Sequence, residues 1–123
     1  MISYTFKKWR YDDQSPTELI IVFTDKKNIG LEELLNVEGF AITLDDILVK
    51  IELVISGESV IEEIGTERSL AEIKENTTTI YDLFEELVPE EEVNPTIKIS
   101  TLELKEIILD YQKHLKLFEE KEE

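Results

Sequence analysis

The chain of 123 residues contains no cysteine, four single glycines and only three prolines. Without cysteine it cannot form disulfides, thiolate metal sites or a thiol nucleophile, and this composition suits a reducing cytosol. Its scattered glycines form neither GxGxxG nor the P-loop pattern, which are the loops that cradle phosphate groups. The HExxH and GxSxG patterns of metalloproteases and serine hydrolases are absent as well. We therefore expect no cofactor and no catalytic residue.

Metal ligands of the nitrogen and sulfur types are nearly missing, because His114 is the only histidine. It lies in the last predicted helix, where we expect it to flank the stripe that contains Tyr111 and Leu115 or to face solvent. No stretch of the sequence matches the calcium-binding loop of an EF-hand. The sequence therefore predicts no metal site.

Long apolar runs are missing too. The longest one, residues 47–55, is broken by Lys50 and Glu52 and is far too short to cross a membrane. The first residues, MISYTFKKWRYDD, lack the apolar centre of a secretory signal. We therefore expect a cytoplasmic protein that makes no membrane contact.

Acidic residues are abundant, with 29 of them against 13 lysines and arginines and a net charge of −16. Residues 28–92 carry −15 of this charge, and the run 82–95, DLFEELVPEEEVNP, holds six carboxylates and no lysine or arginine. Such a field repels nucleic acid and anionic lipid, and it attracts cationic proteins. The basic and aromatic stretch 6–11 does not outweigh this field, so we expect no nucleic-acid binding. The competing interpretation is that the charge only keeps the domain soluble.

Hydrophobic periodicity predicts a single α+β domain over residues 1–123, with an antiparallel or mixed sheet and helices packed on one face. Strands are expected near residues 2–10, 18–24, 47–55, 59–64 and 96–99. Helices are expected near residues 30–36, 79–88 and 100–119. We expect the first two strands to form one hairpin and strands 47–55 and 59–64 to form another. A brief strand is expected at 40–42, and the last few residues are expected to fray.

Residues 44–55 fit two periods. A helical face would hold Leu44, Ile47, Leu48, Ile51 and Ile55, whereas a strand would alternate Val49, Ile51, Leu53 and Ile55 with polar residues. The β-branched residues and the turn-like SGES that follows favour the strand.

Capping and stripe patterns predict the remaining helices. Ile80, Leu83, Phe84 and Leu87 would form a buried helical stripe that ends at Pro89, which leaves Asp82, Glu85 and Glu86 facing outward. Ser69–Glu72 and Ser100–Glu103 both resemble capping boxes, which predicts a helical turn after each. In the last helix the expected core stripe is Leu104, Ile107, Ile108, Tyr111, Leu115 and Phe118, and the residues expected to face away are Glu103, Glu106, Asp110 and Lys113.

The overall size, the opening strand ISYTF and the ending TIKISTLELKEIILDYQKHL, where a strand enters a capped amphipathic helix, carry a resemblance. The chain resembles the small acidic immunity proteins that bacteria encode beside polymorphic or contact-dependent growth inhibition toxins. This resemblance implies a cytoplasmic protein that neutralises a cognate toxin with a basic surface, often a nuclease, by tight one-to-one binding. It implies a monomer alone and a heterodimer with the toxin.

Charge and expected exposure select the candidate partner-binding residues. The first choices are Asp82, Glu85, Glu86, Glu90, Glu91 and Glu92, and the second choices are Glu32, Glu33, Asp45 and Asp46. We expect a binding protein that is not an enzyme. One alternative is a generic adaptor or regulatory subunit. The other is a small enzyme with a carboxylate pair, which would need two carboxyls about 5–10 Å apart in a cleft.

Overall fold

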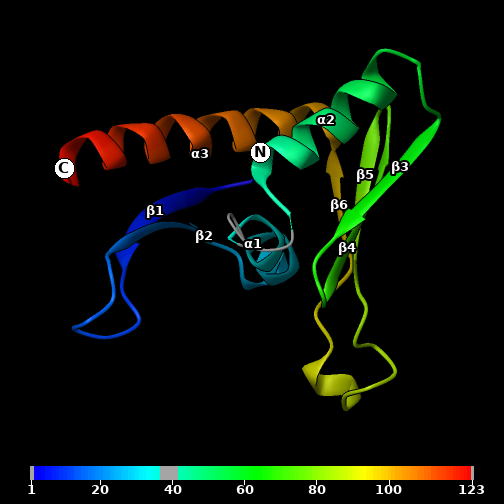
Figure 1. The fold of residues 1–123 in the computed structure, drawn as a ribbon. Coiled ribbons are helices and arrows are strands. Elements are labelled where there is room, and N and C mark those ends of the chain that lie inside the picture. Colours follow the sequence, from blue (N-terminus) through cyan, green and yellow to red (C-terminus); the bar gives the residue numbers. More distant parts are fainter. Residues whose placement is uncertain (1, 37–41, 123) are drawn as a thin grey trace.

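The fold contains two sheets and three α-helices, as seen in a computed structural model that describes residues 2–36 and 42–122 (Figure 1). The strands are β1 (Tyr4–Trp9), β2 (Glu18–Phe23), β3 (Ile61–Gly65), β4 (Ser69–Lys74), β5 (Thr77–Asp82) and β6 (Ile97–Ser100). The α-helices are α1 (Ile29–Leu35), α2 (Leu44–Ile55) and α3 (Thr101–Glu122). Two short 3₁₀ helices are η1 (Lys26–Asn28) and η2 (Glu90–Glu92).

Both sheets are antiparallel, which confirms the α+β class. β1 and β2 form a two-stranded hairpin, and the other four strands follow one another in the order β3-β4-β5-β6. The predicted pairing of 59–64 with 47–55 is wrong, because β3 pairs with β4 instead. Of the brief strand expected at 40–42, residues 40 and 41 lie outside the described residues, and Ile42 is not in a strand.

The predicted strand at 47–55 is wrong, since these residues belong to the helix α2. Thr43 caps this helix: its hydroxyl accepts the Asp46 N–H at 3.1 Å, and the Asp46 carboxylate accepts the Thr43 N–H at 2.9 Å. The buried residues of α2 keep helical spacing, and they are Leu44, Ile47, Ile51 and Val54. A satisfied capping box and a continuous buried face thus outweigh the β-branched composition.

The predicted helix at 79–88 is also wrong, because β5 runs through residues 77–82 and turns follow it. The run of three threonines at its start favours a strand, and backbone pairing to β4 on one side and β6 on the other fixes it there. Ile80 is buried as expected. Leu83 and Leu87 are 47% and 76% exposed, so they are not core residues. The helical turn expected after Ser69 is likewise wrong, because this stretch forms β4.

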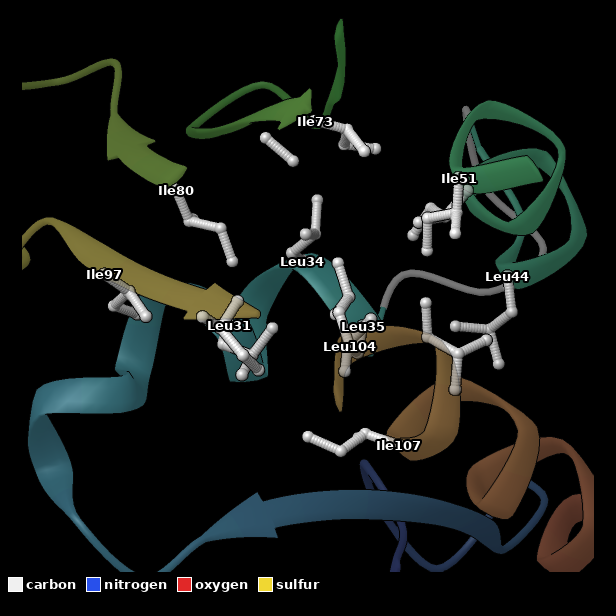
Figure 2. Packing of buried hydrophobic residues seen from close by; sticks show 14 of the residues in the cluster. Leu31, Leu34, Leu35, Leu44, Ile51, Ile73, Ile80, Ile97, Leu104 and Ile107 are labelled. Atoms are coloured by element: carbon white, nitrogen blue, oxygen red, sulfur yellow. The ribbon is translucent and has the colours of Figure 1, made fainter. Parts of the chain in front are cut away.

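The hydrophobic core joins the helices to both sheets, and Figure 2 shows its side chains converging from α1, α2, α3 and the strands. α3 buries the predicted residues Leu104, Ile107, Ile108 and Tyr111. Its first turn is capped by Ser100, whose hydroxyl accepts the Glu103 N–H at 2.9 Å. The helix extends to Glu122, three residues beyond the predicted end at 119.

Two carboxylates of α3 that were expected to face away bind the N-terminal segment instead, one just before β1 and one at its first residue. Glu103 accepts the Ile2 N–H at 2.9 Å, and Asp110 accepts the Tyr4 hydroxyl at 2.8 Å. These contacts hold the β1–β2 hairpin beneath α3 (Figure 1).

The outer edge of β2 is closed by side chains. The amide of Asn36 donates to the Ile21 carbonyl oxygen at 2.9 Å and accepts the Ile21 N–H at 3.0 Å. The Tyr111 hydroxyl lies 2.9 Å from the Leu19 carbonyl oxygen. Because Asn36 occupies the backbone groups that a further strand would use, this edge is protected against pairing with another chain.

Candidate functional site

The candidate site is the segment of residues 83–96, here called the acidic loop, which connects β5 to β6 and projects from one end of the four-stranded sheet (Figure 1). Its five glutamates are all exposed, and they are Glu85, Glu86, Glu90, Glu91 and Glu92. No lysine or arginine occurs between residues 75 and 97. Within the described part of the chain, none of the five carboxylates takes part in an ion pair. The loop is therefore a local source of uncompensated negative charge.

An ion pair between a partly exposed arginine and a buried aspartate anchors the loop. Arg68 lies just before β4, and Asp82 ends β5. The Arg68 Nε donates to Asp82 Oδ1 at 3.0 Å, and the Arg68 Nη2 donates to Asp82 Oδ2 at 2.9 Å. The Asp82 side chain is only 1% exposed. Two parallel charge-assisted hydrogen bonds of this kind fix both the distance and the orientation of the partners.

The same two residues bind both ends of the acidic loop. Asp82 accepts the Phe84 N–H at 2.9 Å and the Asn94 N–H at 2.8 Å. Arg68 donates to the Glu92 carbonyl oxygen at 2.9 Å, and its guanidinium lies over the Phe84 ring at 5.0 Å. These contacts, together with turns such as the one from Leu87 N–H to the Phe84 carbonyl oxygen at 2.8 Å, give the loop a defined conformation.

The electrostatics of Asp82 follow from these partners. The hydrogen bonds from Arg68 lower the pKa of this carboxyl to about 2, and the Asn94 and Phe84 N–H groups act in the same direction against the opposing effect of burial. Asp82 therefore stays ionised at neutral pH and holds the loop throughout the physiological range.

The structure separates the first-choice residues into two groups. The predictions that Glu85, Glu86, Glu90, Glu91 and Glu92 are exposed are confirmed, although the first two lie in a loop rather than on a helix. The expectation that Asp82 faces outward is wrong, because its carboxylate is buried against Arg68. Arg68 and Asp82 are 14 residues apart in sequence, so no local pattern indicates that they pair.

The second-choice residues bind parts of the fold, and among them Glu33 lies near Arg68, the residue that anchors the acidic loop. Glu32 accepts the Phe23 N–H at 3.0 Å, and Glu33 accepts the Thr66 hydroxyl at 2.9 Å, so both bind parts of the fold. Asp46 belongs to the capping box of α2, and Asp45 accepts an N–H of Gln112 at 2.8 Å. Within residues 2–36 and 42–122 no hydrogen bond or ion pair links these four carboxylates to the loop.

Other side chains that could serve chemistry are His114 and the carboxylates near the hollow between β2 and α3. Among the described residues no group of three or more histidine, aspartate or glutamate side chains is placed to hold a metal ion. His114 stacks on Phe6 with ring centroids 4.3 Å apart, and its Nδ1 lies 2.9 Å from the Asp110 carbonyl oxygen. A hollow of about 240 Å³ between β2 and α3 includes Glu18 and Glu119 in its lining. Both are exposed, unlike the desolvated carboxyl that general acid catalysis uses.

None of the helices in the described parts of the chain is both long and apolar enough to cross a membrane. No family model, curated protein or solved structure matches the chain. Its function is therefore inferred from its own residues.

Proposed function

We propose that the protein is a non-enzymatic binding protein, an immunity protein that neutralises a cognate toxin by covering a basic cleft with the acidic loop. The observation that carries this proposal is the loop itself. Five exposed carboxylates without a compensating cation project from the sheet on a backbone that the Arg68–Asp82 pair holds in place. The net charge of −16 acts in the same direction.

Electrostatics explain why such a loop suits a cationic partner. A nuclease must attract phosphate, so its cleft carries lysines and arginines. A carboxylate-bearing surface is attracted to the same cleft, and complementary fields of this kind accelerate association. A loop that is already ordered loses less conformational freedom on binding, which leaves more of the interaction energy for affinity.

The proposed role assigns functions to particular residues of the acidic loop. The proposed contact residues are Glu85, Glu86, Glu90, Glu91 and Glu92, with Asp82 as the residue that positions them. The partner is a toxin domain with a basic surface, the complex is a one-to-one heterodimer formed from a free monomer, and it forms in the cytoplasm.

Co-expression tests this function. On this proposal the toxin is encoded by an adjacent reading frame. The chain is expressed with the protein that this frame encodes, and cell survival and complex formation are measured. We expect protection and a complex that weakens as salt is added, because exposed charges are screened at high ionic strength. A toxic neighbour that is neither bound at low salt nor neutralised would contradict the proposal.

An adaptor role is the second candidate, since α3 also presents apolar side chains to solvent. Leu102, Leu109 and Leu117 are 59%, 46% and 46% exposed along this helix. A partner that protects these α3 residues from hydrogen exchange while the acidic loop stays unprotected would favour the adaptor.

A further inference from the structure

Three apolar side chains lie exposed where β5 leads into the acidic loop. Tyr81 is 39% exposed, Leu83 is 47% exposed and Leu87 is 76% exposed. Tyr81 lies opposite Leu70 in the register of β4 and β5. Ala71 and Ile80 are buried in the core, and successive residues of a strand point to opposite faces of a sheet, so Leu70 and Tyr81 lie on the other face. The helices α1 and α2 lie on the core side of this sheet (Figure 1).

Leu83 and Leu87 do not belong to the hydrophobic core. Their backbone is fixed all the same, because the Leu83 N–H donates to the Arg68 carbonyl oxygen at 2.6 Å and the Leu87 N–H donates to the Phe84 carbonyl oxygen at 2.8 Å. Two leucines are thus exposed to water on an ordered loop, beside the exposed glutamates, where a partner can reach both kinds of side chain.

The neighbouring charges define the partner. Glu85 and Glu86 stand between the two leucines in sequence, and Glu90 follows soon after. A purely apolar partner would leave these carboxylates desolvated and unpaired. A partner with lysines or arginines between its apolar side chains would satisfy both kinds of group at once.

We propose that Tyr81, Leu83 and Leu87 form the apolar centre of a docking surface for a cationic protein segment that carries apolar side chains between its basic ones. This inference deepens the proposed function and rests on it, because it names what a toxin must present to the acidic loop. Apolar anchors at the centre of an interface supply most of its binding energy, and the charges around them act mainly on the association rate.

A pair of synthetic peptides tests the surface without the toxin. The probes are an octapeptide of alternating lysine and leucine and an octapeptide of alternating lysine and serine. Each is titrated into the full chain in physiological salt and followed by nuclear magnetic resonance. We expect the lysine–leucine peptide to bind about ten-fold more tightly or better, since its leucines bury apolar surface. The shifts should centre on Tyr81, Leu83 and Leu87.

Matched variants locate the effect. The double variant Leu83→Ser and Leu87→Ser should reduce the preference for the lysine–leucine peptide to near unity. The control double variant Leu102→Ser and Leu109→Ser removes two leucines of similar exposure from α3 and should keep the preference. Circular dichroism of both variants checks that the fold is intact.

Four results would overturn this inference. They are equal binding of the two peptides by the wild-type chain, an unchanged preference in the Leu83 and Leu87 variant, peptide shifts centred on α3, and occupation of the patch by a second copy of the chain. The co-expression test separates this inference from the proposed function. Protection by a chain that shows no peptide preference overturns only the inference, whereas peptide preference without protection overturns only the immunity role.

Discussion

Polar side chains line both the outer edge of β2 and the acidic loop. At β2 they bind the backbone, whereas in the loop they face solvent. At β2, Asn36 and Glu32 turn inward and bind backbone groups of Ile21 and Phe23. At the acidic loop, Arg68 and Asp82 pair beneath its base, and the five glutamates of the loop stay in water. The same residue types therefore close one surface and leave the other open. At β2 the polar side chains satisfy backbone N–H and C=O groups of an edge strand, which would otherwise remain unpaired.

We expect the largest loss of stability when the Arg68–Asp82 pair, which anchors the acidic loop, is broken. Asp82→Asn removes the buried charge of a bidentate pair and leaves the partly exposed Arg68 without its counter-ion. We expect the free energy of unfolding to fall by about 3 kcal/mol in denaturant titration. Hydrogen exchange of the Phe84 and Asn94 amides should accelerate. Asp13→Asn is the matched control, because Asp13 has a side chain 99% exposed and only a 3.8 Å contact to Arg10. A loss equal to that of the control would remove the anchoring role of Asp82.

Protonation of Asp82 at low pH should break the same ion pair with Arg68. The pKa of Asp82 is lowered to about 2 in the folded chain, below its ordinary value of 3.8. A group with a depressed folded pKa contributes stability above its unfolded pKa and loses it as the pH falls through the folded pKa. Between about pH 4 and pH 2 we expect roughly 2 kcal/mol to be lost through Asp82. The Asp82→Asn variant should lose correspondingly less over that range in acid-unfolding curves. Parallel curves for the two proteins would contradict this assignment.

We expect a smaller loss of stability from a substitution at the outer edge of β2. Asn36→Ala leaves the N–H and C=O of Ile21 without their side-chain partner. An unsatisfied buried backbone group is costly, so we expect a loss of about 1.5 kcal/mol, together with faster aggregation at the freed edge. Light scattering and denaturant titration measure the two changes. Asn76→Ala, at an exposed asparagine, should alter neither.

Sequence patterns predicted the segments with one unambiguous period. The β1–β2 hairpin, α1, β6 and α3 lie where alternation, helical stripes and the Ser100 cap placed them. Residues 44–55 satisfied two periods, and the reciprocal cap between Thr43 and Asp46 decided between them. The spacing of Ile80, Leu83, Phe84 and Leu87 imitated a helix, but pairing with β4 and β6 is a long-range effect that local patterns do not contain.

For the candidate site, the local sequence predicted which glutamates are exposed, but it did not predict the ion pair that anchors the loop. The proline-bounded run at Glu90–Glu92 is exposed as the sequence indicated. The anchoring of this run depends on Arg68, which is remote in sequence and meets Asp82 only when β4 and β5 pair. The exposed leucines were missed because their spacing matched a core stripe.

The most direct test of the central claim, that the acidic loop attracts a cationic partner, is the association rate measured against salt concentration. The triple variant of Glu90, Glu91 and Glu92 to Lys is compared with the triple variant of Glu106, Glu119 and Glu120 to Lys. The second variant changes the net charge equally at exposed positions of α3. With the toxin that the co-expression experiment identifies, we predict that the loop variant associates about ten-fold more slowly and with a flatter salt dependence. The α3 variant should show a clearly smaller change. Equal rates and equal salt slopes for the two variants would contradict the claim.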